Sequence, residues 1–217
     1  PATPMSDEAI ALEQSAEDFL ERNAHLPEYL ARAVAWLYGS VFCPFIEFLT
    51  RPNWLLIILF ILLYKFGDAV LTVMKIPFFL ELGFSNTEIG TIAKLVGFPP
   101  IIIGGLFGGL LLAKTGIMRG LLISGIFMAA SNLVFVLQSW VGYSQEMLAV
   151  TIAIENFTTS MGTVAFVAYL SSLCNIAYTA TQYALLTSFM AFSRTVMTSG
   201  SGWVADQVSW PVFFMLT

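Results

Sequence analysis

The long apolar runs of this sequence limit it to a fold that can sit in a lipid bilayer. A helix needs about 20 apolar residues to cross the hydrocarbon core of a bilayer. Hydrophobic residues make up 58% of the 217 residues and charged residues only 11%, whereas soluble domains carry about 25% charged residues. The sequence therefore predicts an all-α integral membrane protein. Apolar segments of sufficient length lie at about 53–80, 87–112, 120–140, 147–172 and 182–204, and a sixth begins near residue 210.

The first 50 residues differ in composition from the rest of the chain. They hold eight acidic residues against Arg22 and Arg32, and the chain begins with Pro1, without the apolar core of a signal peptide. We expect an acidic cytoplasmic linker over 1–25, an amphipathic interfacial helix over 26–50 and a transmembrane bundle over 51–217. The absence of an initial Met also suggests a piece of a longer protein.

The distribution of Lys and Arg predicts the orientation of the bundle. Arg51 precedes the first span, and Lys114 and Arg119 lie between the second and third spans. The loops at 81–86, 141–146 and 205–209 contain no Lys or Arg. Because cytoplasmic loops are enriched in these residues, we expect residues 1–52 to lie on the cytoplasmic side.

Three charged residues interrupt the first apolar span, "ILLYKFGDAVLTVMKIPFF". Lys65, Asp68 and Lys75 fall within an arc of about 80° on a helix. Each charge at mid-bilayer costs roughly 2.5–3.5 kcal/mol on insertion scales, and such residues usually serve a function. We expect this face to line a polar pathway. Two structural alternatives remain: a local ion pair between Lys65 and Asp68, and a Lys75 side chain that extends to the outer interface.

Other spans carry similar polar positions. Lys94 lies in the second span, Glu155 in the fourth and Arg194 in the fifth. Together with the residues of the first span, the mid-membrane groups are four cations and two carboxylates, and this excess of positive charge favours an anionic substrate. The cations are Lys65, Lys75, Lys94 and Arg194, and the carboxylates are Asp68 and Glu155. A Lys94–Glu155 interhelical ion pair and a structural role for Arg194 are the alternatives. The residues that could donate or accept hydrogen bonds to a substrate are Asn156, Tyr169, Gln182 and Tyr183.

Two local patterns have a structural interpretation. Ser85 and Glu88 are spaced as a capping box that starts a helix, and the glycines of "IIIGGLFGGLLL" permit close helix packing. No catalytic motif is present, and Cys43, Cys174 and His25 have no metal-ligand spacing. The sequence has no basic patch of the kind that binds nucleic acid. We therefore expect no enzyme activity, cofactor, metal or nucleic-acid partner.

Several segments resemble the AmpG family of muropeptide permeases, a branch of the major facilitator superfamily near the acetyl-CoA transporters. The segments that carry this resemblance are "LLYKFGDAV", "PFFLELGFSNTEIGTIAK", "GTVAFVAYLSSLCNIAYTATQYALLTS" and "SGWVADQVSWPVFF". "GGLLLAKTGIMR" is similar to the glycine-and-basic cytoplasmic loop of the superfamily, although the usual acidic residue is absent.

The resemblance implies that the chain is the C-terminal six-helix half of a transporter whose other half is missing. It also implies proton-coupled import of anionic anhydro-muropeptides across the bacterial inner membrane, for peptidoglycan recycling and β-lactamase induction. On this hypothesis, Asp68 and Glu155 carry protons, and Lys65, Lys94 and Arg194 bind substrate carboxylates. Asn156, Tyr169, Gln182 and Tyr183 bind sugar or peptide groups. The alternatives are transport of acetyl-CoA or another anionic metabolite, and a membrane signalling or scaffold role without transport.

Overall fold

The computed structural model describes residue 14 and residues 37–175 and 178–217. These residues form helices and connecting turns, and no strand occurs among them, as the sequence predicts. Most of the linker expected at 1–25 and the first part of the helix expected at 26–50 lie outside the described residues. The helices are η1 (a π-helical turn, Tyr38–Phe42), α3 (Cys43–Thr50), α4 (Trp54–Tyr64), α5 (Phe66–Glu81), α6 (Asn86–Leu95), α7 (Phe98–Thr115), α8 (Ile117–Val141), α9 (Gln145–Leu173), α10 (Thr179–Thr198), α11 (Ser201–Gln207) and α12 (Trp210–Leu216).

Four helical segments among the described residues are long and apolar enough to cross a membrane. They are Trp54–Glu81, Phe98–Thr115, Ile117–Val141 and Gln145–Leu173. The sequence led us to expect a fifth continuous span over 182–204. In the structure this region is divided, because α10 ends at Thr198 and α11 begins only after Gly200. Glycine and serine are weak helix formers, and Arg194 and several hydroxyl groups make α10 more polar than the other spans.

Two expected spans contain a break where helices meet end to end. Lys65 separates α4 from α5, with φ −96° and ψ 1°. Val96 and Gly97 separate α6 from α7. α7 starts with two prolines in its first turn, a position where proline is favourable because its missing N–H is not needed there. At each break a hydrogen bond joins the chain to α9, as described below.

The chain divides into two compact units, and the first combines the described parts of Pro1–Ile61 with Leu170–Met190. In this unit Cys43 and Tyr178 form a small buried cluster against which Tyr38 packs. Polar side chains from α3 and the start of α10 are also buried in this unit. Its interior therefore relies on hydrogen bonding as well as on apolar packing.

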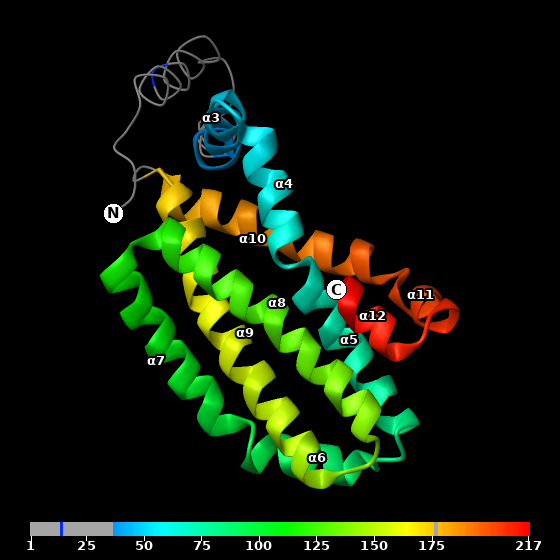
Figure 1. Cartoon of the computed structure of the whole chain (residues 1–217). Helices are drawn as coiled ribbons and strands as arrows, with labels where there is room; N and C mark the ends of the chain where they lie inside the picture. Colours follow the sequence, from blue (N-terminus) through cyan, green and yellow to red (C-terminus); the bar gives the residue numbers. More distant parts are fainter. Residues whose placement is uncertain (1–13, 15–36, 176–177) are drawn as a thin grey trace. The chain divides into compact units, whose positions relative to one another are not determined.

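The second unit, Leu62–Tyr169 with Ala191–Thr217, contains the larger apolar core. Figure 1 shows α7, α8 and α9 alongside one another, with α12 against α8. Phe78 of α5 lies at the centre of an aromatic cluster, with its ring 6.2 Å from Phe135, 5.1 Å from Trp210 and 4.8 Å from Phe214 between centroids. Ring pairs at such distances contribute about 0.5–1.5 kcal/mol beyond their buried area, so this cluster joins α5, α8 and α12.

The glycine pairs of α7 are divided between a packed face and an open face. A Cβ atom at Gly104 would collide with the Phe157 carbonyl oxygen of α9, and one at Gly108 would lie 3.0 Å from the Met161 carbonyl oxygen. A Cβ atom at Gly109 would meet nothing within 4 Å. Only one of the two glycine rows is therefore required for the close approach of α7 to α9.

The capping box predicted at the start of α6 is confirmed. The Glu88 amide donates to Ser85 Oγ at 3.2 Å, and the Ser85 amide donates to Glu88 Oε2 at 2.8 Å. Phe84 is buried, and its ring stacks on Tyr143 in the turn before α9 with centroids 4.6 Å apart. These contacts join the α5–α6 turn to the α8–α9 turn.

Candidate functional site

The first polar contact between two membrane-spanning segments is an ion pair between α5 and α9. Lys75 Nζ lies 2.8 Å from Glu155 Oε1 and 3.1 Å from Oε2. The Glu155 side chain is 4% exposed and the Lys75 side chain 25% exposed. Glu155 therefore pairs with Lys75 and not with Lys94, and the Lys75 side chain does not extend unpaired to the outer interface.

A second ion pair lies about two helical turns away, at the start of α5. Lys65 Nζ is 2.8 Å from Asp68 Oδ2, in the local pairing that was one of the alternatives from the sequence. Both residues also contact α9: Lys65 donates to Thr163 Oγ1 at 3.2 Å, and Thr159 Oγ1 donates to Asp68 Oδ1 at 3.1 Å. The pair is thus held in place by two hydroxyl groups of the neighbouring helix.

The order of these contacts defines an antiparallel polar seam. Going along α5 from Lys65 through Asp68 to Lys75, the partners on α9 run backwards in sequence. We call these six residues the α5–α9 seam: Lys65, Asp68, Lys75, Glu155, Thr159 and Thr163. Two opposite charges in each half leave the seam neutral as a whole, which lowers the cost of placing it between apolar helices.

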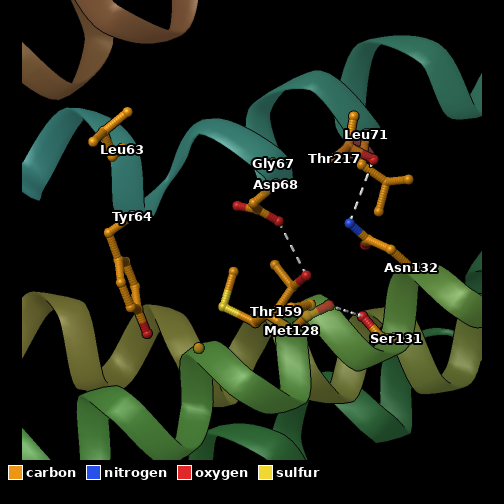
Figure 2. Close-up of a pocket in the computed structure, with 12 residues that line it drawn as sticks. Leu63, Tyr64, Gly67, Asp68, Leu71, Met128, Ser131, Asn132, Thr159 and Thr217 are labelled. Atoms are coloured by element: carbon orange, nitrogen blue, oxygen red, sulfur yellow. Dashed lines mark hydrogen bonds between the residues drawn. The ribbon is translucent and has the colours of Figure 1, made fainter. Parts of the chain in front are cut away.

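The seam borders a small hollow that is shown in Figure 2. Its volume is about 120 Å³, and Asp68, Thr159 and Asn132 contribute polar atoms to its wall. Tyr64 and Met128 lie beside them. Pockets for organic ligands usually measure 300–1,000 Å³, so this hollow is suited to water molecules rather than to a glycopeptide.

Gln182, one of the predicted substrate-binding residues, belongs to a buried network in the first unit. Its amide nitrogen donates to the Pro44 carbonyl oxygen at 3.1 Å and to Glu47 Oε2. Its amide oxygen accepts from the Asn175 amide at 2.7 Å and from Arg51 at 3.3 Å. An amide side chain has two donors and two acceptor sites. A hydrogen bond from Gln182 to a substrate would therefore require one of these contacts to break.

Arg51 and Glu47 complete this network. Arg51 Nη2 lies 2.7 Å from Glu47 Oε2, and Arg51 Nη1 donates to the Leu173 carbonyl oxygen at the end of α9. Helices end with carbonyl groups that have no intrahelical partner, so Arg51 provides one of the missing donors. The sequence had suggested only that Arg51 marks the cytoplasmic side.

The other predicted residues have separate surroundings. Asn156 donates to the Gly97 carbonyl oxygen at 3.0 Å and so contacts the break between α6 and α7. Tyr169 is buried in α9, and Tyr183 is partly buried in α10. Lys94, in the last turn of α6, and Arg194, in α10, are exposed and form no ion pair with any described residue.

Sequence reasoning missed some of the polar residues that the fold brings together. Thr163 and Asn132 have no feature in the sequence that separates them from other small polar residues in apolar helices. Glu47 is one of eight acidic residues among the first 50. Its spacing of four residues from Arg51 could have predicted their pairing. Within the described residues, no group of three His, Cys, Asp or Glu is placed to hold a metal ion.

Long apolar helices with buried ion pairs define a multi-pass membrane protein, and comparison with known proteins identifies its kind. The chain is 38% identical over 184 residues to "Putative transporter AmpG 4" of Rickettsia felis, a match that covers 85% of this chain and 44% of the relative. It is 41% identical over 161 residues to "Putative transporter AmpG 3" of Rickettsia prowazekii, with 74% and 38% covered. It is 36% identical over 182 residues to the "Anhydromuropeptide permease" of Escherichia coli K12, with 83% and 37% covered.

These matches confirm the resemblance inferred from the sequence. Over most of its length the chain is homologous to the AmpG-type permeases. It spans less than half the length of these relatives. No family model matches the chain.

Proposed function

We propose that the chain forms one half of a proton-coupled secondary transporter that imports anionic anhydro-muropeptides across the bacterial inner membrane. The name of the Escherichia coli relative supports this class of substrate. The transported fragments would serve peptidoglycan recycling and β-lactamase induction, and residues 1–52 would lie in the cytoplasm. The driving force would be the proton gradient, with no cofactor.

The α5–α9 seam is the observation that carries this proposal. Four charged side chains occupy apolar spans, although each charge at mid-bilayer is costly. Pairing reduces that cost, but apolar side chains would avoid it altogether. Titratable groups in such positions are the expected components of a proton pathway, and Asp68 and Glu155 are the two carboxylates available in the seam.

A transporter of this type places its substrate site between two halves. Lys94 and Arg194 are exposed in the described chain and are available to an anion or to a partner. We therefore propose that a second six-helix half completes the site. With that half in place, Lys65, Lys94 and Arg194 would bind carboxylates, and Asn156, Tyr169, Gln182 and Tyr183 would contact sugar or peptide groups.

Uptake of labelled anhydro-muropeptide tests the proposal. Cells without their own permease would express this chain alone, this chain with a first six-helix half, or a single longer protein that contains both. We expect accumulation only where both halves are present. A protonophore, which collapses the proton gradient, should abolish that accumulation. Absence of uptake in every well-expressed form would overturn the proposed substrate. Competition by acetyl-CoA in a form that does transport would point to the alternative cargo.

The assignment of Asp68 and Glu155 has its own test. In vesicles of the transporting form, Asp68→Asn and Glu155→Gln are each expected to reduce pH-driven accumulation by at least tenfold. Facilitated exchange without a pH gradient should persist. Normal coupling in both variants would remove the two carboxylates from the proton pathway. If variants that transport no substrate kept their biological output unchanged, that result would favour the signalling or scaffold role.

A further inference from the structure

Lys75 and Glu155 differ in how they are exposed and in what else they contact. Glu155 is 4% exposed, and both of its carboxylate oxygens contact Lys75. Among the described residues, its carboxylate has no other hydrogen-bond donor. The Lys75 side chain is 25% exposed, and an ammonium group has three N–H donors. An anion can therefore approach Lys75 while Glu155 still holds it.

We infer that Lys75 is a binding residue for a carboxylate of the transported substrate, and that Glu155 is the counter-ion displaced by it. This inference rests on the proposed function and extends it to a residue with no role there. A substrate carboxylate would first take the remaining N–H of Lys75 and then replace Glu155. The cation would keep an anionic partner throughout.

This exchange would require one proton. Once Lys75 pairs with the substrate, the Glu155 carboxylate would be left as a buried anion without a partner, which is strongly unfavourable. A proton from the outer aqueous phase that binds a Glu155 oxygen removes that charge. One proton would thus enter with each carboxylate bound at Lys75, and it would leave when the Lys75–Glu155 pair forms again after substrate release.

The surroundings of Glu155 favour this direction. The charged groups that act on its carboxylate among the described residues are Lys75 and Asp68, both of α5. The turn between α6 and α7, α7 itself and α8 also contact α9, through Gly97, Gly104 and Gln138, which are all uncharged. When Lys75 changes partner, no cation among the described residues remains paired with the Glu155 carboxylate.

The other lysine of the seam lacks these properties. Lys65, in the break before α5, pairs with Asp68 three residues further along the chain, and it also donates to Thr163. Asp68 would retain Thr159 as a donor if Lys65 moved. Glu155, in contrast, would retain no hydrogen-bond donor among the described residues if Lys75 moved. Of the two lysines, Lys75 is therefore the one whose change of partner leaves a buried carboxylate with no hydrogen-bond donor, and we couple protonation to it.

The test compares two substrates in the transporting form: an anhydro-muropeptide with a free peptide carboxylate and the same molecule with that carboxylate amidated. We expect Lys75→Gln to raise KM for the acid about 10- to 100-fold, the effect of losing one charge-assisted hydrogen bond. KM for the amide should change less than threefold. Unsubstituted protein should co-transport about one proton fewer with the amide than with the acid. Lys114→Gln, at an exposed position in the last turn of α7, is the matched control.

A double variant, Lys75→Gln with Glu155→Gln, guards against a folding defect, because it leaves no unpaired charge. It should be expressed normally, and its KM should again be raised for the acid and nearly unchanged for the amide. Equal effects of Lys75→Gln on acid and amide, or equal proton flux with both, would overturn the inference while the proposed function stands. Absence of uptake of either molecule by the unsubstituted protein would overturn the proposed function, and this inference with it.

Discussion

The Tyr143 hydroxyl donates a hydrogen bond of 2.5 Å to Glu88 Oε1, from the turn before α9 to the first turn of α6. Gln145 donates to the same oxygen at 2.7 Å, and Ser85 donates twice to the other one, through its amide and its hydroxyl. One carboxylate thus caps a helix and joins two turns. The stacking of Phe84 on Tyr143 reinforces this connection.

The Glu88 contacts should make the stability of these turns depend on pH. Hydrogen bonds from Tyr143, Ser85 and Gln145 lower the pKa of Glu88 from 4.5 to about 2. A lowered pKa stabilises the fold fully above pH 4.5, and this contribution is lost as the pH falls toward 2. We expect Glu88→Gln to lower the unfolding temperature in detergent at pH 6, and the difference from the unsubstituted protein to shrink by pH 3. Glu81→Gln, at an exposed residue, should show no such trend; an equal trend in both variants would contradict the prediction.

The contact of α7 with α9 predicts opposite results for two glycines five residues apart. Gly104→Ala should destabilise the protein by about 1–3 kcal/mol, because its methyl group would collide with the Phe157 carbonyl oxygen. Gly109→Ala should be neutral or stabilise by roughly 0.5–1 kcal/mol, because alanine favours the helix and nothing lies nearby. Unfolding free energies in the same detergent would measure both. Similar losses for the two variants would argue against this packing.

The network around Gln182 predicts a structural role for that side chain. Gln182→Leu would remove the acceptor of the Asn175 backbone amide and one of the donors to Glu47. Leaving a buried polar group without its hydrogen-bond partner costs about 1–3 kcal/mol. We expect a marked loss of unfolding free energy, with KM for substrate nearly unchanged in the protein that remains folded. Ser188→Ala, in the exposed part of α10, should change stability by less than about 0.5 kcal/mol. A large rise in KM without loss of stability would instead support substrate binding by Gln182.

The Lys65–Asp68 pair predicts non-additive substitutions. Lys65→Met removes the cation that balances Asp68, and breaking a shielded pair in this way costs about 3–5 kcal/mol. The double variant with Asp68→Asn leaves no uncompensated charge, so it should be more stable than Lys65→Met alone. A double-mutant cycle on unfolding free energies measures this coupling. Additive losses would show that the two charges do not depend on each other.

Much of the site could be named from the sequence because charge stands out in an apolar segment. Lys65, Asp68, Lys75 and Glu155 are all visible in this way. The Lys65–Asp68 pair was one of the alternatives that the sequence offered. The pairing of Lys75 with Glu155 was not predictable, because residues 80 positions apart come together only when α5 and α9 pack side by side. The sequence allowed Glu155 to pair with Lys94, whereas the fold brings it to Lys75.

The sequence by itself determined that this chain is helical, lies in a membrane and resembles AmpG-type permeases. These properties follow from the length of its apolar runs and from residue patterns that are local in the chain. The tertiary structure decided which charges neutralise one another, which glycine row is in contact and that Gln182 has no unused hydrogen-bonding group. Those features depend on distances between helices, and hydrophobic periodicity gives only the face that a residue occupies, not the side chain that it meets.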